Sequence, residues 1–130
     1  MGYRSEVVLA VSKEMKPHFL TILARHESVR RLVHDAEVFD KDYQEEGGLL
    51  LAWASLKWYD SYPEVAAIDK FVDDCESGCL EGWDNEASGD YANCEYEHFR
   101  FVRIGGESDD IKESGHFAMD SIYVSRSVEF

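Results

Sequence analysis

The sequence predicts an α+β domain in which a mainly antiparallel sheet carries two or three helices on one face. Short β-branched apolar runs bounded by polar residues indicate strands. Longer segments with apolar residues three and four positions apart indicate helices. The expected order is β-α(α)-β-β-α-β-β, and the short connections between neighbouring strands favour antiparallel pairing. With 130 residues, 45% of them hydrophobic, the chain is expected to form one domain spanning 1–130.

The first third of the chain is expected to form a strand followed by helices. Residues 4–12 (RSEVVLAVS) are short, β-branched and bounded by polar residues, which predicts a strand. Residues 13–36 place apolar side chains at helical spacing, and Pro17 suits the first turn, where its missing N–H matters least. Residues 27–28 favour a break between two shorter helices, with Ser28 as a candidate cap.

A β-hairpin is expected around Gly47 and Gly48, which together are a turn signal. A weaker, acidic strand precedes them, and residues 49–59 (LLLAWASLKWY) predict a strong central strand. Aromatic residues gather where this strand ends: Trp53, Trp58, Tyr59 and Tyr62. They are expected to form core and a lid at the sheet edge, and whichever of Trp58 and Tyr59 faces outward would offer a binding surface.

The next helix is expected to begin within the sequence SYPE. Ser61 can cap it and Glu64 can complete a capping box, with Pro63 in the first turn. Gly78 is a natural helix stop. The side chains expected to face the core recur at helical spacing: Val65, Ile68 and Val72.

The C-terminal third is expected to contribute two strands. Residues 95–105 predict the first, which Gly105 and Gly106 end. Residues 107–114 predict a polar loop or a short helical turn. Residues 117–130 predict the final strand, with one face formed by Ile122, Val124 and Val128.

The charge is strongly acidic and unevenly distributed. The formal net charge is −14. Residues 1–31 hold six basic and three acidic side chains, a net +3, whereas the rest hold seven basic and 24 acidic ones, a net −17. Such a field repels phosphates and anionic membranes, so it argues against direct nucleic-acid or membrane binding and favours a basic protein partner. The plain alternative is that the acidic surface keeps the protein soluble.

Two groups of carboxylates are the candidate partner-binding residues. From Phe71 to Phe99 the chain carries nine carboxylates and no lysine or arginine. The first group lies in this stretch: Asp73, Asp74, Glu76, Glu81, Asp84, Glu86 and Asp90. The second group lies around the expected hairpin: Asp40, Asp42, Glu45 and Glu46.

The same stretch contains a spacing that is admissible for structural zinc. Cys75, Cys79, Cys94 and His98 form C-x3-C-x14-C-x3-H, which supplies four soft donors in two close pairs. The alternative is that Cys75 packs as a small apolar residue and that His98 lies on a strand face.

A calcium-loop template overlaps the zinc spacing. Its ligand and turn positions would fall on Asp84, Glu86, Ser88, Gly89 and Glu95. Against it, Ala92 offers no side-chain ligand and the flanking helices are missing from the prediction. The two metal hypotheses compete, because the adjacent Cys94 and Glu95 would point to opposite faces of a strand.

Catalytic motifs are sparse in this sequence. It has no glycine-rich phosphate loop, nucleophile elbow or HExxH motif. Asp109, Asp110 and His116 could serve a hydrolase as a carboxylate pair and a general base, although an acidic solvated turn explains the same residues.

The expected location is the cytoplasm, with reduced thiols. The apolar run Val7–Val11 is too short for a signal peptide, and no run approaches the roughly 18 apolar residues of a membrane span. Three cysteines cannot all pair within one chain.

Several stretches carry a resemblance to a known group of proteins. MGYRSEVVLAV, LKWYDSYPEVAAIDKFV, FRFVRIGGESDDI and IYVSRSVEF resemble small acidic proteins of tailed bacteriophages and prophages, a group with no established active site to carry over. The resemblance covers most of the chain in patches. It implies an accessory protein in the bacterial host cytoplasm that binds and blocks a host factor, such as a defence nuclease.

Together these features favour a non-enzymatic protein that binds a basic host protein through an acidic surface, as an inhibitor or nucleic-acid mimic. A small zinc- or calcium-binding module is the alternative, and a hydrolase is a remote one. Apart from a metal, no cofactor is expected. The sequence leaves homo-oligomerisation open.

Overall fold

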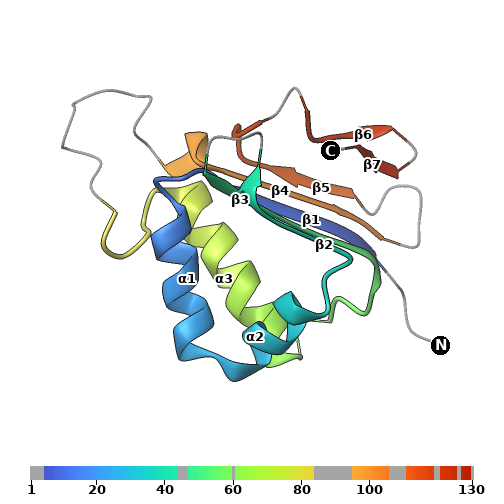
Figure 1. Cartoon of the computed structure of the whole chain (residues 1–130), viewed down its shortest axis with the longest axis horizontal. Coiled ribbons are helices and arrows are strands. Elements are labelled where there is room, and N and C mark those ends of the chain that lie inside the picture. The colour runs from blue at the N-terminus through green and yellow to red at the C-terminus, as the bar shows by residue number, and fades with distance from the viewer. Residues whose placement is uncertain are drawn as a thin grey trace.

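The computed structural model describes residues 5–43, 47–59, 61–83, 95–105, 111–118, 121–125 and 127–129. They form an α+β protein, as predicted, with three α-helices on one face of a five-stranded antiparallel sheet (Figure 1). The strand order is β2-β3-β1-β4-β5, and a separate two-stranded hairpin lies on the opposite side of the sheet from the helices (Figure 1). The sheet is therefore covered on both faces.

The elements follow one another in the order β1, α1, α2, β2, β3, α3, η2, β4, β5, β6 and β7. The helices are α1 (Lys16–Arg25), α2 (Glu27–His34) and α3 (Pro63–Ser77), with a short 3-10 turn, η2 (Glu95–Glu97). The strands are β1 (Ser5–Val11), β2 (Val38–Tyr43), β3 (Gly48–Leu56), β4 (Phe99–Ile104), β5 (Ile111–Ser114), β6 (Tyr123–Ser125) and β7 (Ser127–Glu129).

The central strand β1 is buried on both faces because alternate side chains enter two different cores. Val7 and Leu9 belong to the core shared with the helices, where they meet residues such as Phe19, Phe71 and Phe101. Val8 and Ala10 belong to a smaller core on the opposite face, which also contains Ile122. This double burial explains why the β1 sequence is almost continuously apolar.

The first two helices divide at His26 and not at the predicted break. Ser28 does not cap α2, because His26 occupies the cap position and makes no side-chain cap hydrogen bond. Arg30 instead donates from Nη1 to the carbonyls of Leu23 (2.6 Å) and Ala24 (3.2 Å). A cation at the carbonyl end of a helix is favourable, so Arg30 stabilises the end of α1. Pro17 lies in the first turn of α1, as predicted.

The capping box predicted at the start of α3 does not form. The cap position is Tyr62, and no side chain closes a cap hydrogen bond there, so Ser61 and Glu64 do not form the expected reciprocal pair. The end of α3 is as predicted: Gly78 adopts a left-handed backbone with φ of 71° and terminates the helix. Val65, Ile68 and Val72 are buried, as their spacing indicated.

The C-terminal third departs most from the prediction. Residues 95–98 precede the strand as a 3-10 turn and a bend, and β4 begins only at Phe99. Ile111–Ser114 is a strand and not a loop or helical turn, because it pairs with β4 from Ile104↔Ile111 to Phe101↔Ser114. The expected final strand is a tight hairpin of β6 and β7.

A buried arginine joins this C-terminal region to the sheet. Arg100 is 7% exposed. Its guanidinium donates to the carbonyl oxygens of Ile122 (3.1 Å) and Gly115 (3.0 Å) and to Glu113 Oε1 (3.1 Å). One planar guanidinium on β4 thus holds two segments, residues 113–115 at the end of β5 and Ile122 directly before β6.

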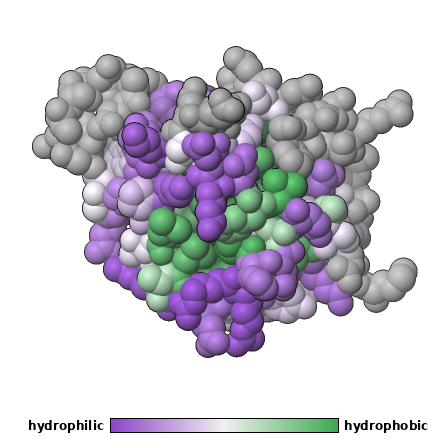
Figure 2. Space-filling model, viewed as in Figure 1, coloured by the Kyte–Doolittle hydropathy of each residue, from purple (hydrophilic) through white to green (hydrophobic). Residues whose placement is uncertain are grey.

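The surface seen in the orientation of Figure 1 is not uniformly charged. Figure 2 shows a hydrophobic area in the middle of this face, surrounded by hydrophilic residues. Leu20 of α1 and Phe39 of the edge strand β2 are 43% and 42% exposed. Charged side chains therefore do not cover this face evenly.

Candidate functional site

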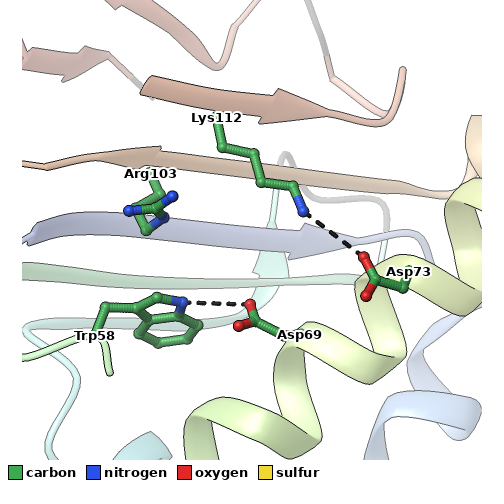
Figure 3. A pocket seen from close by; sticks show the side chains of 5 residues that line it. All are labelled: Trp58, Asp69, Asp73, Arg103 and Lys112. Atoms are coloured by element: carbon green, nitrogen blue, oxygen red, sulfur yellow. Dashed lines mark hydrogen bonds and ion pairs between the residues drawn. The ribbon is translucent and has the colours of Figure 1, made fainter. Parts of the chain in front are cut away.

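A hollow of about 360 Å³ lies between α3 and the β4–β5 edge of the sheet (Figure 3). The lining residues that the structure describes come from four parts of the chain: Trp58, Asp69, Asp73, Arg103 and Lys112. Trp58 lies two residues beyond the end of β3, and Asp69 and Asp73 lie one turn apart on α3. Arg103 and Lys112 are direct register partners on β4 and β5, so their side chains share one face of the sheet.

Trp58 forms a fixed wall of the hollow. The residue is buried, its ring centroid lies 5.9 Å from that of Phe101, and its indole Nε1 donates to Asp69 Oδ1 at 3.3 Å. The same bond therefore orients the indole and the Asp69 carboxylate (Figure 3). The sequence had left open which of Trp58 and Tyr59 faces outward. Trp58 is the buried one, and Tyr59 is half-buried and packs edge-on against Tyr62.

Lys112 reaches across the hollow from β5 to α3. Its ammonium nitrogen lies 3.8 Å from Asp73 Oδ1, 3.6 Å from Glu76 Oε1 and 5.9 Å from the centre of the Phe101 ring (Figure 3 shows the Asp73 pair). These separations are longer than the 2.7–2.9 Å typical of charge-assisted hydrogen bonds. The lysine thus balances the carboxylates without forming a tight bond to either.

The charges in the hollow are segregated by element. The α3 side is anionic, through Asp69 and Asp73, and the sheet side is cationic, through Arg103 and Lys112. Trp58 supplies an aromatic surface at one side. None of the described lining residues is a serine, threonine, cysteine or histidine, and the charged groups they offer are two carboxylates, an amine and a guanidinium.

Residues 71–99 contain no lysine or arginine, but lysines from outside this stretch contact the predicted acidic residues on α3. Asp73 and Glu76 face Lys112, and Asp74 Oδ2 accepts a hydrogen bond of 2.7 Å from Lys70, whose pKa is raised by that contact. Glu81 is exposed in the turn beyond the helix. Three further predicted residues of this group lie outside the described residues: Asp84, Glu86 and Asp90.

The second predicted acidic group shapes a turn. Asp40 Oδ1 accepts the backbone N–H of Asp42 at 2.9 Å, and Asp42 Oδ1 accepts that of Gly47 at 2.7 Å. These two carboxylates therefore support the β2–β3 connection as well as contributing charge. Glu45 and Glu46 lie outside the described residues.

The zinc candidates occupy different environments. Cys75 is buried in the helix-side core, Cys79 is exposed, and His98 Nδ1 lies 2.8 Å from Ser12 Oγ. Cys94 lies outside the described residues. Within the ranges that are described, no three His, Cys, Asp or Glu side chains come together as metal ligands. Cys75 thus matches the alternative of a small apolar core residue, whereas His98 precedes β4 and is not on a strand.

Glu95, the last position of the calcium template, is a buried structural carboxylate. It is 1% exposed, and its Oε2 accepts the backbone N–H of Leu80 at 3.0 Å, which ties η2 to the chain leaving α3. Burial, together with the Glu95 carboxylate, raises the pKa of the Cys75 thiol far above its ordinary value. The other calcium candidates lie outside the described residues: Asp84, Glu86, Ser88 and Gly89.

His116 is the one hydrolase candidate that the structure describes, and it is not among the described lining residues of the hollow. His116 is exposed, with Nδ1 2.8 Å from Glu97 Oε1 and its ring edge-on to Tyr96. This arrangement is a surface ion pair whenever the imidazole is protonated. Asp109 and Asp110 lie outside the described residues.

Three lining residues of the hollow were missed by sequence reasoning: Asp69, Arg103 and Lys112. The spacing of Asp69 and Asp73 places them on one helix face, which was a usable signal. Arg103 follows Phe101 by two positions, so a strand pattern places both on the helix side. Lys112 gave no comparable signal, because its segment was interpreted as a loop.

Comparisons with known proteins identify no relative: no protein-family model, no curated protein and no solved structure matches this chain. Among the described residues, none of the helices has the length and apolar character required to cross a membrane.

Proposed function

We propose that the protein is a phage-type accessory protein that binds a basic protein of its bacterial host in the cytoplasm and inhibits it without catalysis. The acidic face of α3, defined as Asp69, Asp73 and Glu76, is the proposed contact surface. A basic partner fits a chain of net charge −14, because the field draws cationic surfaces and repels nucleic acid.

The observation that carries the proposal is the convergence of Asp73 and Glu76 on one ammonium group, that of Lys112, at 3.8 and 3.6 Å. This face of α3 already arranges two carboxylates around a single lysine nitrogen. A lysine or arginine from a partner would find the same arrangement. Lys112 already contacts these carboxylates, so the partner side chain would either displace Lys112 or bind beside it.

The spacing along α3 also supports nucleic-acid mimicry. From Asp69 to Glu76 the helix axis advances about 10 Å, at about 1.5 Å per residue. One strand of DNA carries about three phosphates over that length. Three carboxylates on this face therefore resemble the charge density of a short phosphate track.

The stretches that carry the phage-protein resemblance meet at this place. LKWYDSYPEVAAIDKFV contributes Trp58 and Asp69, and FRFVRIGGESDDI contributes Arg103. Their meeting in one hollow supports a functional use of this side of the molecule.

The test is a pull-down from bacterial lysate at low and at high salt, with a charge-matched pair of variants. Asp73→Asn/Glu76→Gln removes two charges from the acidic face, and Glu27→Gln/Asp35→Asn removes two from the first residue and the C-cap of α2. The expected result is a salt-sensitive basic partner that is lost with the first variant and kept with the second. The absence of a partner, salt-insensitive binding or equal loss with both variants would overturn the proposal.

A further inference from the structure

The hollow between α3 and β4–β5 has features that the binding of a basic protein does not require. Its two opposed walls carry opposite charges, two carboxylates on α3 and two cations on the sheet, so the formal charge of the described lining residues is zero. The α3 carboxylates alone would serve a basic partner. Arg103 and Lys112 place two cations on the wall opposite those carboxylates.

We propose that this hollow binds a compact zwitterion of the α-amino-acid class. The ligand ammonium would lie toward Asp69 and Asp73, and the ligand carboxylate toward Arg103 and Lys112. This goes beyond the proposed host-protein binding and does not depend on it.

The charge arrangement selects against ligands with a single charge. A simple anion is attracted by the sheet wall and repelled by the α3 wall, and a simple cation meets the reverse. A molecule with both charges a few ångströms apart satisfies both walls together. Arginine adds geometric preference, because its planar guanidinium can hold a carboxylate through two parallel hydrogen bonds.

The size and rigidity of the hollow suit a small ligand. Its volume of about 360 Å³ lies near the lower end of the roughly 300–1,000 Å³ typical of ligand sites. The Trp58 indole is fixed by Asp69 and packs near Phe101, so the aromatic wall exists before binding. A preformed wall lowers the entropic cost of binding and offers an apolar surface to the ligand side chain.

The ion pair across the hollow does not obstruct this ligand. Lys112 lies 3.8 Å from Asp73, and its side chain is 34% exposed. Because the contact is long and partly solvated, a ligand ammonium can replace Lys112 beside the Asp73 carboxylate at a small cost in free energy. Lys112 is then available to the ligand carboxylate.

The experiment uses three probes with the same phenyl side chain: L-phenylalanine, 2-phenylethylamine, which lacks the carboxylate, and 3-phenylpropanoate, which lacks the ammonium. Glycine and L-glutamine test other side-chain sizes. Each is titrated into the full-length protein, with the Trp58 indole N–H resonance as the readout and Trp58→Phe to assign it. We expect at least one of the three amino acids to give a saturable shift, and both single-charge probes to bind at least tenfold more weakly than L-phenylalanine or to give no shift.

Two variants locate the site. Arg103→Gln and Asp69→Asn are each expected to weaken amino-acid binding at least tenfold, whereas Arg31→Gln on α2 should leave it unchanged. Thermal melts establish that each variant is folded. The proposal is overturned if no amino acid shifts the resonance, if a single-charge probe binds as well as L-phenylalanine, or if folded Arg103→Gln binds as wild type does. Arg103 is not part of the acidic face of α3, so this result is independent of the host-protein pull-down.

Discussion

The ammonium nitrogen of Lys112 lies 3.8 Å from Asp73 Oδ1, across the hollow that separates β5 from α3. Glu76 approaches the same nitrogen at 3.6 Å. One lysine thus partly balances two of the three carboxylates on the proposed contact face.

Removing that lysine should strengthen binding of a basic partner. Lys112→Met exposes Asp73 and Glu76 to the partner and keeps an apolar stem against Phe101. We expect several-fold tighter binding at low salt, measured by calorimetry with the captured partner, and a change in unfolding free energy below about 1 kcal/mol because the pair is partly exposed. Lys13→Met removes the same charge from the β1–α1 connection and should have a smaller effect. Equal gains from both variants would indicate that net charge alone matters.

Arg100 should be among the most sensitive positions for stability. In Arg100→Met the carbonyls of Gly115 and Ile122 lose their charged donor, and the expected cost is about 3 kcal/mol of unfolding free energy. Arg100→Lys should recover little, because one ammonium cannot reproduce the three-way fork. Urea denaturation measures both.

The matched control for Arg100 is Arg31→Met. Arg31 pairs with Glu27 at 3.3 Å, but its side chain is 74% exposed. Its loss should change stability by less than about 0.5 kcal/mol. A cost for Arg100→Met as small as that of the control would contradict the role assigned to the buried fork.

The sequence predicted those parts of the fold that depend on local pattern. The β-branched run of β1 and the apolar spacing of Val65, Ile68 and Val72 specify an element regardless of its neighbours. The polar segment Ile111–Ser114 does not, and it is a strand because β4 supplies hydrogen-bonding partners along its length. Strands β6 and β7 likewise pair with each other, although their sequence resembles one continuous strand.

The candidate site was less predictable because it is assembled by register and packing. Asp73 was singled out for its charge alone. Arg103 and Lys112 become neighbours only through the β4–β5 pairing. The bond from Trp58 to Asp69 requires the connection after β3 to fold back along α3. None of these relationships is encoded in a short spacing.

Gly115 should tolerate no side chain. Its φ is +89°, and a Cβ placed there would lie 1.9 Å from the Phe99 carbonyl oxygen. Gly115→Ala must therefore displace β4 or the chain after β5, and we expect a loss of at least about 3 kcal/mol in urea denaturation.

Gly82→Ala is the control for Gly115→Ala, because it has the same kind of backbone strain without the close contact. Gly82 has a similar φ of +83°, but the nearest atom to an added Cβ is His18 Cε1 at 3.7 Å. The expected loss is about 1 kcal/mol, from the left-handed backbone alone. Similar losses for the two alanine variants would show that the contact with Phe99 relaxes easily. A Gly115→Ala chain found only in the insoluble fraction, beside soluble Gly82→Ala, agrees with the expectation.

Cys75 should make the protein less stable in alkaline solution. Burial, with the Glu95 carboxylate nearby, raises the pKa of the folded thiol above its ordinary value of 9.0. The unfolded chain therefore releases the Cys75 proton at a pH where the folded chain retains it. The contribution of the neutral thiol is fully present below about pH 9 and is lost as pH rises further, by about 1.4 kcal/mol for each pH unit.

Cys75→Ala isolates this contribution, because lysines and tyrosines titrate alike in both proteins. The difference in unfolding free energy between wild type and Cys75→Ala should be constant from pH 6 to 8 and should shift against the wild type by about 1.4 kcal/mol near pH 10. In a Cys79→Ser/Cys94→Ser background, the remaining buried thiol should react with a water-soluble disulfide reagent only after urea is added. Parallel stability curves, or rapid labelling of the folded protein, would place the Cys75 sulfur in contact with water and not in the core between α3 and the sheet.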